Sequence, residues 1–206
     1  DGWGNKSYQL KICAELALNA GVPLINFHPP NWLFFEFKFW RWLNKIKDFQ
    51  SEIGQNGVLI TIENMPCLPQ FIKINPYLLA KIDNMVRFME ERNLYLTFDT
   101  AHCGSMHTDF LGDFHQFYES GRMRNIHFSD YGNDQEHLLP GHGALPLTRF
   151  LNHLRETSYD HALVLELAPH EFPKEQELIK ETLIEIFEYL CKETRHSSSR
   201  TGEERG

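Results

Sequence analysis

Several features of membrane, secreted and nucleic-acid-binding proteins are missing from this 206-residue sequence. No apolar run is long enough to cross a membrane, and no basic segment followed by an apolar one opens the chain, so neither insertion nor export is expected. A net charge of -8 gives no overall attraction for nucleic acid or anionic lipid. No run interleaves basic and aromatic residues as a nucleic-acid track would. Nucleic acid is therefore a disfavoured partner unless a local patch binds it.

Cysteine is scarce, and no two cysteines form a CxxC pair. A chain of this length does not need disulfides for stability, so the scattered thiols indicate a reducing, cytoplasmic location. The hydrophobic share of 42% is enough for one sizeable core. The four cysteines are Cys13, Cys67, Cys103 and Cys191.

Apolar runs of strand length alternate with longer segments of helical period. The runs are VPLINF, VLITI, LYLTF, MRNI and HALVL. Helices are expected over residues 7–20, 32–50, 76–93, 109–120, 147–157 and 174–192. This alternation is typical of parallel β/α units and predicts an α/β fold. We expect one domain over residues 1–193 and a disordered tail over 194–206, where the sequence becomes SSSRTGEERG.

Each apolar run meets a polar side chain that can bind a metal at its carboxyl end. These side chains are His28, Glu63, Asp99, His127 and Glu166. The carboxyl ends of all strands converge on one face of a parallel β/α barrel, so residues far apart in sequence meet there. Carboxylate oxygens and imidazole nitrogens suit a divalent cation without any thiolate. The sequence therefore predicts a metal site at this face.

Some of these residues also have a simpler interpretation. Asp99 is followed by Thr-Ala-His and is a candidate helix N-cap. His28 lies between Phe27 and Pro29 and could be an ordinary packed histidine. Glu63 and Glu166 are harder to explain in this way, because glutamate is a poor N-cap and a buried, unpaired carboxylate is costly. His102 could be a ligand, a substrate contact or a helix-start residue.

The ordered motifs INFHPP, TIENMP, TFDTAHCG, NIHFSDYGNDQEHLLPGHG and LELAP resemble the superfamily of xylose-isomerase-like TIM barrels. This superfamily includes sugar-phosphate isomerases, epimerases and endonuclease IV, the AP endonuclease family 2 group. The resemblance covers roughly residues 7–192 and implies a TIM (β/α)8-type fold. It implies that one divalent metal (Mn, Mg, Co or Zn) is bound by Glu63, Asp99, His127 and Glu166. It also implies that Glu63 and Glu166 flank the substrate carbon as the catalytic pair of an isomerase.

The endonuclease branch of the superfamily implies up to three zinc ions. His28 would share a further zinc with Glu63, and His102 and His137 would match ligands of a third. The aspartate expected two residues before His137 is Gln135 here, although Asp134 is adjacent, and the expected Gly-Glu-Gly is Gly141-His142-Gly143. These departures favour the isomerase interpretation.

The count of strands departs from the superfamily as well. A TIM barrel has eight strands and about 250 residues, whereas five strands are expected here, corresponding to the last five β/α units. An open sheet of this kind would expose two edges, and the chain opens on Asp1 rather than methionine. We therefore expect a truncated or incomplete product, or another chain that completes the barrel.

The predicted function is that of a metal-dependent isomerase or epimerase of carbohydrate metabolism acting on an open-chain sugar or sugar phosphate. One carboxylate would remove a carbon-bound proton and the other would return it at a neighbouring or opposite position. The alternatives are a zinc-dependent AP endonuclease and a degenerate binding or scaffold protein. Asp130 is expected to orient a ligand histidine, and residues 134–143 are expected to form a polar loop that closes over substrate.

The aromatic segment at residues 32–50 is the main support for the scaffold alternative. Phe35, Phe39, Trp42, Ile46 and Phe49 recur at helical spacing and are expected to face the barrel. Phe34, Phe37 and Trp40 fall outside that stripe. The simpler interpretation is a helix rich in core aromatics. The alternative is a second aromatic face covered by a missing segment, by another subunit or by a membrane surface. Coverage by another subunit would make a homo-oligomer through the helix at residues 32–50.

Overall fold

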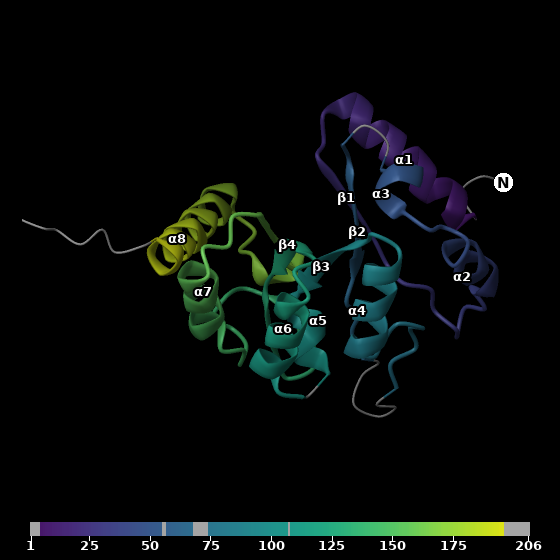
Figure 1. Ribbon diagram of the computed structural model, residues 1–206. Coiled ribbons are helices and arrows are strands. Elements are labelled where there is room, and N and C mark those ends of the chain that lie inside the picture. Colours follow the sequence, from purple (N-terminus) through teal and green to yellow (C-terminus); the bar gives the residue numbers. More distant parts are fainter. Residues whose placement is uncertain (1–4, 55–56, 68–73, 107, 196–206) are drawn as a thin grey trace, which may run out of the picture. The chain divides into compact units, whose positions relative to one another are not determined.

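Five parallel strands form the central sheet of the computed structural model, in the order β1-β2-β3-β4-β7 (Figure 1). They are β1 (Leu24–Phe27), β2 (Leu59–Glu63), β3 (Tyr95–Asp99), β4 (Met123–Phe128) and β7 (Ala162–Leu165). The structure describes residues 5–54, 57–67, 74–106 and 108–195, so most of the predicted tail lies outside it. The strands predicted from the apolar runs are confirmed, and together with helices they form the half-barrel of a TIM-type α/β fold.

The alternation of side chains along β3 explains how the sheet separates core from site. Phe98 points to the outer face, where its ring contacts three phenylalanines of helix α6 (Phe110–Glu119) at centroid distances of 5.4 to 6.3 Å. Thr97 and Asp99, on either side of Phe98, therefore face the inner side of the sheet. Helix α4 (Ile82–Glu91) lies beside α6 (Figure 1) and buries its own apolar face.

The first helix follows the prediction closely. Helix α1 spans Lys6–Ala20; the Asn5 side chain accepts hydrogen bonds from the amides of Ser7 and Tyr8 at its start. Gly21 ends the helix in the left-handed conformation that glycine tolerates best.

The single helix predicted over residues 32–50 is wrong. The segment contains two short helices, α2 (Phe37–Leu43) and α3 (Phe49–Glu52). Phe35 adopts a positive φ of 54°, which no α-helix accommodates, and its side chain is 81% exposed instead of facing the sheet. Asp48 then caps α3 with its carboxylate. Phe39, Ile46 and Phe49 are buried as predicted.

The predicted helix over residues 76–93 begins only at Ile82. The residues before it pair with the chain that follows β1, where Trp32 N–H donates to Pro76 C=O at 3.0 Å and Asn31 forms an antiparallel bridge with Tyr77. A helix could not make these contacts, because its own backbone would use the same groups.

The predicted loop over residues 134–143 begins as a hairpin between β5 (Asp130–Gly132) and β6 (Gln135–Leu138). Asn133 and Asp134 form its two-residue turn with φ of 51° and 58°, which matches a turn that twists with its strands. Helix α5 (Thr100–Ser105) contacts both strands of this hairpin.

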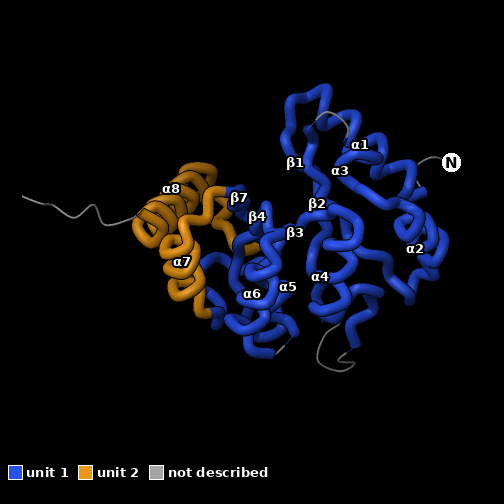
Figure 2. The backbone as a smooth tube through the Cα atoms, in the orientation of Figure 1, with its two compact units in different colours: residues 1–145, 161–168 blue, residues 146–160, 169–206 orange. Residues whose placement is uncertain are grey.

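The described residues group into two compact units, shown in different colours in Figure 2. The larger unit (residues 1–145 and 161–168) contains all the strands. The smaller unit contains α7 (Leu147–Glu156), the short helix η2 (Pro169–Glu171) and α8 (Gln176–Thr194), in close agreement with the predicted helices. Within it, Arg155 donates to the Glu193 carbonyl at 2.9 Å. None of the helices described is both long and apolar enough to span a membrane.

Candidate metal centre

Four predicted ligands meet at the carboxyl ends of the strands in the larger unit. Glu63 ends β2, Asp99 ends β3, His127 lies near the end of β4, and Glu166 directly follows β7. Asp99 and His127 are register partners. Each of the four offers one ligand atom that lies within 4.8 Å of the others. The parallel sheet thus brings together residues that are up to 103 positions apart in the chain (166 − 63).

Close but unpaired polar atoms characterise this cluster. His127 Nδ1 lies 2.5 Å from Glu166 Oε2, 3.3 Å from Glu63 Oε1 and 3.9 Å from Asp99 Oδ2. His127 Nδ1, Glu166 Oε2 and Asp99 Oδ2 are nevertheless buried without a hydrogen-bond partner. Buried polar atoms that converge without pairing are costly. A divalent cation among them would satisfy all three, so the residues present fit such an ion.

The electrostatics of the cluster are those of a strongly coupled group of charges. Burial alone would raise the pKa of Glu63, but the imidazoles of His102, His127 and His28 outweigh it and hold that pKa far below its usual range. Burial alone would lower the pKa of His127, but Glu166 and Glu63 raise it to about 10. Burial raises the pKa of Asp99 to about 6. Without a cation, the neighbouring carboxylates therefore favour the protonated, positively charged form of His127.

Asp99 caps a helix with one carboxylate oxygen and turns the other toward the cluster of possible ligands. Its Oδ1 accepts a hydrogen bond from His102 N–H at 2.7 Å and caps helix α5, while Oδ2 faces the cluster. The side chain of Asn64 holds the backbone of Asp99 from both sides, donating to its carbonyl at 2.9 Å and accepting from its amide at 2.8 Å. Asn64 was not predicted as a site residue, although it directly follows Glu63 in the TIENMP motif.

His28 and His102 flank Glu63 on different sides. His28 Nε2 lies 3.4 Å from Glu63 Oε2, and its side chain is about half exposed. His102 is buried, with Nδ1 3.3 Å from Glu63 Oε1 and 3.0 Å from the Asn64 carbonyl. Burial alone would lower the pKa of His102, but Asp99 and Glu63 raise it to about 9.

A second group of possible ligands consists of His102, Glu136 and His137, whose ligand atoms also lie within 4.8 Å of one another. The rings of the two histidines are 5.2 Å apart. Glu136 was not predicted as a site residue, because the resemblance to the superfamily places the expected carboxylate at Gln135, two residues before His137. The β5–β6 hairpin and the positive φ of His137, 61°, allow its immediate neighbour Glu136 to reach the same point. A carboxylate is therefore present in this group after all.

Asp130 contacts the backbone of the loop after the hairpin. Its buried carboxylate accepts hydrogen bonds from the amides of Tyr131 at 2.8 Å, and of Gly141, Gly143 and Leu145 at 3.0 Å each. A side chain on Gly143 would place Cβ only 2.3 Å from Asp130 Oδ1. These contacts indicate that Asp130 orders the loop, whereas the sequence interpretation had it orienting a ligand histidine.

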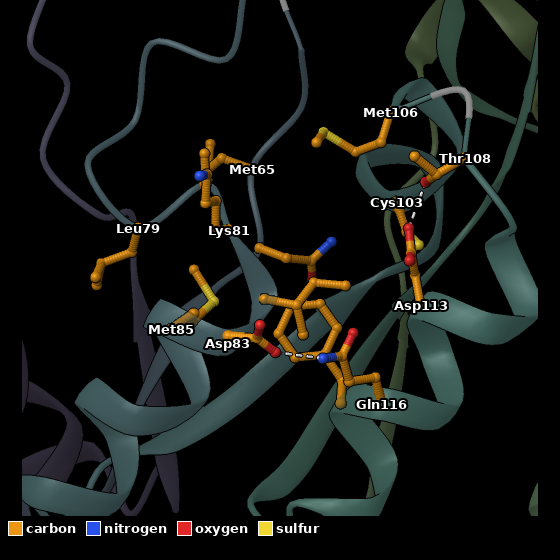
Figure 3. A pocket seen from close by; sticks show the side chains of 14 residues that line it. Met65, Leu79, Lys81, Asp83, Met85, Cys103, Met106, Thr108, Asp113 and Gln116 are labelled. Atoms are coloured by element: carbon orange, nitrogen blue, oxygen red, sulfur yellow. Dashed lines mark hydrogen bonds between the residues drawn. The ribbon is translucent and has the colours of Figure 1, made fainter.

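A separate cavity of about 340 Å³ lies between the start of α4 and helices α5 and α6 (Figure 3). Three methionines are among the residues that line it, and Asp83 accepts a hydrogen bond from Gln116 at 2.5 Å at its edge. Its polar edge groups bond to one another, as Thr108 also does with Asp113. It adjoins the candidate metal centre through Asn64, which lines the cavity and donates to the Asp99 carbonyl.

Comparison with known proteins agrees with this architecture. The family model described as xylose isomerase-like TIM barrel matches residues 6–186, and the chain belongs to this family. The uncharacterized protein MJ1311 of Methanocaldococcus jannaschii is 31% identical over 142 residues, covering 64% of this chain. This chain spans 45% of the length of that relative.

Two solved structures illustrate the range of the fold. D-psicose 3-epimerase from Clostridium cellulolyticum, solved with D-tagatose, has a TM-score of 0.65 and 14% identity; the match covers 91% of this chain and 68% of the epimerase. Endonuclease IV from Thermus thermophilus has a TM-score of 0.61 and 18% identity, with 90% and 69% covered. At these identities the likeness establishes the fold, and one structure is named for a sugar epimerase and the other for an endonuclease.

Proposed function

We propose that this chain carries the metal centre of a divalent-metal-dependent sugar isomerase or epimerase. The observation that carries the proposal is the cluster of Glu63, Asp99, His127 and Glu166, the last three of which each bring one buried polar atom without a hydrogen bond. Three carboxylates and one imidazole match the ligand preference of Mn²⁺, Mg²⁺, Co²⁺ or Zn²⁺. The activity of the whole protein is part of the proposal, since the chain spans less than half of its curated relative.

A bound cation would polarise the carbonyl and adjacent hydroxyl of an open-chain sugar and acidify the proton on the hydroxyl-bearing carbon next to the carbonyl. Glu63 and Glu166 lie at neighbouring positions of the cluster and serve as the pair that removes and returns that proton. Their exposures differ sharply: the Glu63 side chain is 2% exposed and the Glu166 side chain 44%. Glu166 is therefore the carboxylate more open to a substrate that arrives from solvent.

Deuterium exchange tests this proposal directly. A ketose such as D-tagatose, incubated in D₂O with Mn²⁺ and the protein, should gain deuterium at a carbon next to its carbonyl, observed by NMR. Glu166→Gln should abolish exchange while keeping the side-chain volume. Glu156→Gln, an exposed position on α7, is the matched control and should exchange like the wild type. Failure to bind Mn²⁺, or equal exchange by wild type and Glu166→Gln, would contradict the proposal.

Phosphodiester cleavage is a second candidate, favoured by the group of His102, Glu136 and His137. With His28 beside Glu63, this group offers ligands for more than one zinc ion. Several metals around one phosphate can activate a water molecule and stabilise the leaving oxygen. Cleavage of a duplex oligonucleotide with one abasic site, dependent on added Zn²⁺ and on Glu136, would replace the isomerase proposal with this one.

A further inference from the structure

A row of polar side chains lies one layer below the metal centre, on the inner face of the sheet. Side chains two residues apart share a face of a strand. Asn26, Thr61, Thr97 and Asn125 stand two residues before His28, Glu63, Asp99 and His127. Asn26 and Thr61 are register partners, as are Thr97 and Asn125. Bulky branched apolar residues normally fill this layer of a β/α barrel, so the polar row needs an explanation.

Hydrogen bonds connect the row across four strands and end at Glu63. Asn125 Nδ2 donates to Thr97 Oγ1 at 3.3 Å, and the hydroxyls of Thr97 and Thr61 are 2.8 Å apart. Thr61 Oγ1 donates to Asn26 Oδ1 at 3.3 Å or to the Ile25 carbonyl at 3.1 Å. Asn26 Nδ2 donates to Glu63 Oε2. Thr61 and Thr97 are fully buried and Asn125 is 3% exposed.

The donors and acceptors of this row, taken together with Glu63, fix the orientation of the Asn26 amide. Each hydroxyl has one proton, and a carbonyl acceptor takes that of Thr61, so Thr97 must donate to Thr61 and accept from Asn125. The ionised Glu63 carboxylate can only accept, so the Asn26 nitrogen faces Glu63 and the Asn26 oxygen faces Thr61. Asn26 therefore presents a donor to the carboxylate.

The two oxygens of Glu63 are thereby given different tasks. Oε2 contacts Asn26 and lies 3.4 Å from His28 Nε2, whereas Oε1 lies 3.3 Å from Nδ1 of His127. We propose that Asn26, held by Thr61 and Thr97, is a positioning residue that turns Oε1 of Glu63 toward the cation. This inference rests on the proposed function, because it assigns the row to a metal centre. It adds residues that would act on the cation through Glu63 and would not bind it directly.

Cobalt binding tests the positioning role. Titration with Co²⁺ gives both an affinity and a visible spectrum that reports ligand geometry. Asn26→Leu should weaken Co²⁺ binding by about 10-fold or more, as loss of a group that orients a ligand typically does, and should change the spectrum. Thr61→Val should act in the same direction, and Thr61→Ser should restore the wild-type affinity and spectrum. Thr182→Val, which removes a hydroxyl on α8, is the matched control and should bind as the wild type does.

Two results would overturn the inference. One is a set of folded Asn26→Leu and Thr61→Val proteins that bind Co²⁺ like the wild type with the same spectrum. The other is an NMR spectrum in which the Asn26 side-chain amide signals do not move in Thr61→Val or Glu63→Gln. The NMR measurement needs no metal. A wild type that binds no Co²⁺ would therefore contradict the proposed function. The NMR result would still decide whether the row of polar side chains positions Glu63.

Discussion

Asp99 and His102 are joined by a 2.7 Å hydrogen bond that caps helix α5 and uses only one of the two Asp99 carboxylate oxygens. The other oxygen is buried, makes no hydrogen bond and faces His127. One side chain thus serves the fold and the proposed metal centre through different atoms. The two roles can be separated by mutation.

Asp99→Asn should lose metal and keep the fold. Asparagine is as good a helix cap as aspartate, and the substitution removes a buried charge. The melting temperature of the metal-free variant should therefore equal or exceed that of the metal-free wild type. Co²⁺ affinity should fall by more than about 100-fold, since a direct ligand matters more than the groups around it. Asp99→Ala should lose metal and also about 1 kcal/mol of stability with the cap. Equal stability of the two variants, by urea denaturation, would contradict the capping role.

Metal binding should strengthen as the pH rises from 6 to 9. The pKa of His127 is raised to about 10, so the cation must displace a proton from it, and about one proton should be released per ion. Calorimetry in buffers of different ionisation enthalpy measures that number. A pH-independent affinity would show that His127 is not a ligand.

The metal-free protein should respond to pH in the opposite sense. The raised pKa of His127 contributes stability that is complete below its ordinary value of 6.5 and is lost as the pH rises toward 10. The lowered pKa of Glu166 contributes stability that is present above its ordinary value of 4.5 and is lost in acid. The free energy of unfolding without metal should therefore decline between pH 6.5 and 10. Denaturation at several pH values with a chelator checks this.

Glu136→Gln should remove one zinc ion per chain and leave the first centre intact. The group of His102, Glu136 and His137 loses its only carboxylate in this variant, whereas Glu63, Asp99, His127 and Glu166 are unchanged. Elemental analysis of zinc-loaded protein should give two ions for the wild type and one for the variant. An identical zinc content in both proteins would exclude Glu136 as a ligand.

Gly143→Ala should destabilise the protein by about 1 to 3 kcal/mol, the usual cost of overpacking. Its Cβ would collide with Asp130 and with the Tyr131 carbonyl, at 2.3 and 2.5 Å. Gly121→Ala is a useful comparison, because its φ of 65° strains alanine but its surroundings are open. A smaller loss for Gly143→Ala than for Gly121→Ala in urea denaturation would contradict the role assigned to Asp130.

The strands and the meeting of four possible ligands at their ends could be predicted because the signal of each is local. An apolar run that stops at a carboxylate or histidine can be read without knowing the rest of the fold. Glu136 could not be placed in this way, since its position depends on the two-residue turn at Asn133 and Asp134. The row from Asn26 to Asn125 has a period-two signal in the sequence, because each member stands two residues before a predicted site residue, but a polar residue inside a strand does not by itself indicate a site.

The helix errors have a different physical cause. Apolar spacing over residues 32–50 is helical, but the left-handed backbone of Phe35 breaks the helix and turns its ring outward. Contacts between residues far apart also override local propensity, as where Trp32 takes the Pro76 carbonyl as its partner. Neither feature can be recognised from hydrophobic period alone.

The two groups of possible ligands lie on structural elements that differ in how much of the fold depends on them. The first depends on the register of β2, β3, β4 and β7, so almost any change that shifts it would disturb the whole sheet. The second takes two of its three members from a short hairpin with a tight turn. Substitutions, insertions or deletions in that hairpin can change this group without changing the five-stranded sheet. Divergence of chemistry in such a chain would begin at residues 130–138, while the strand ends stay constant.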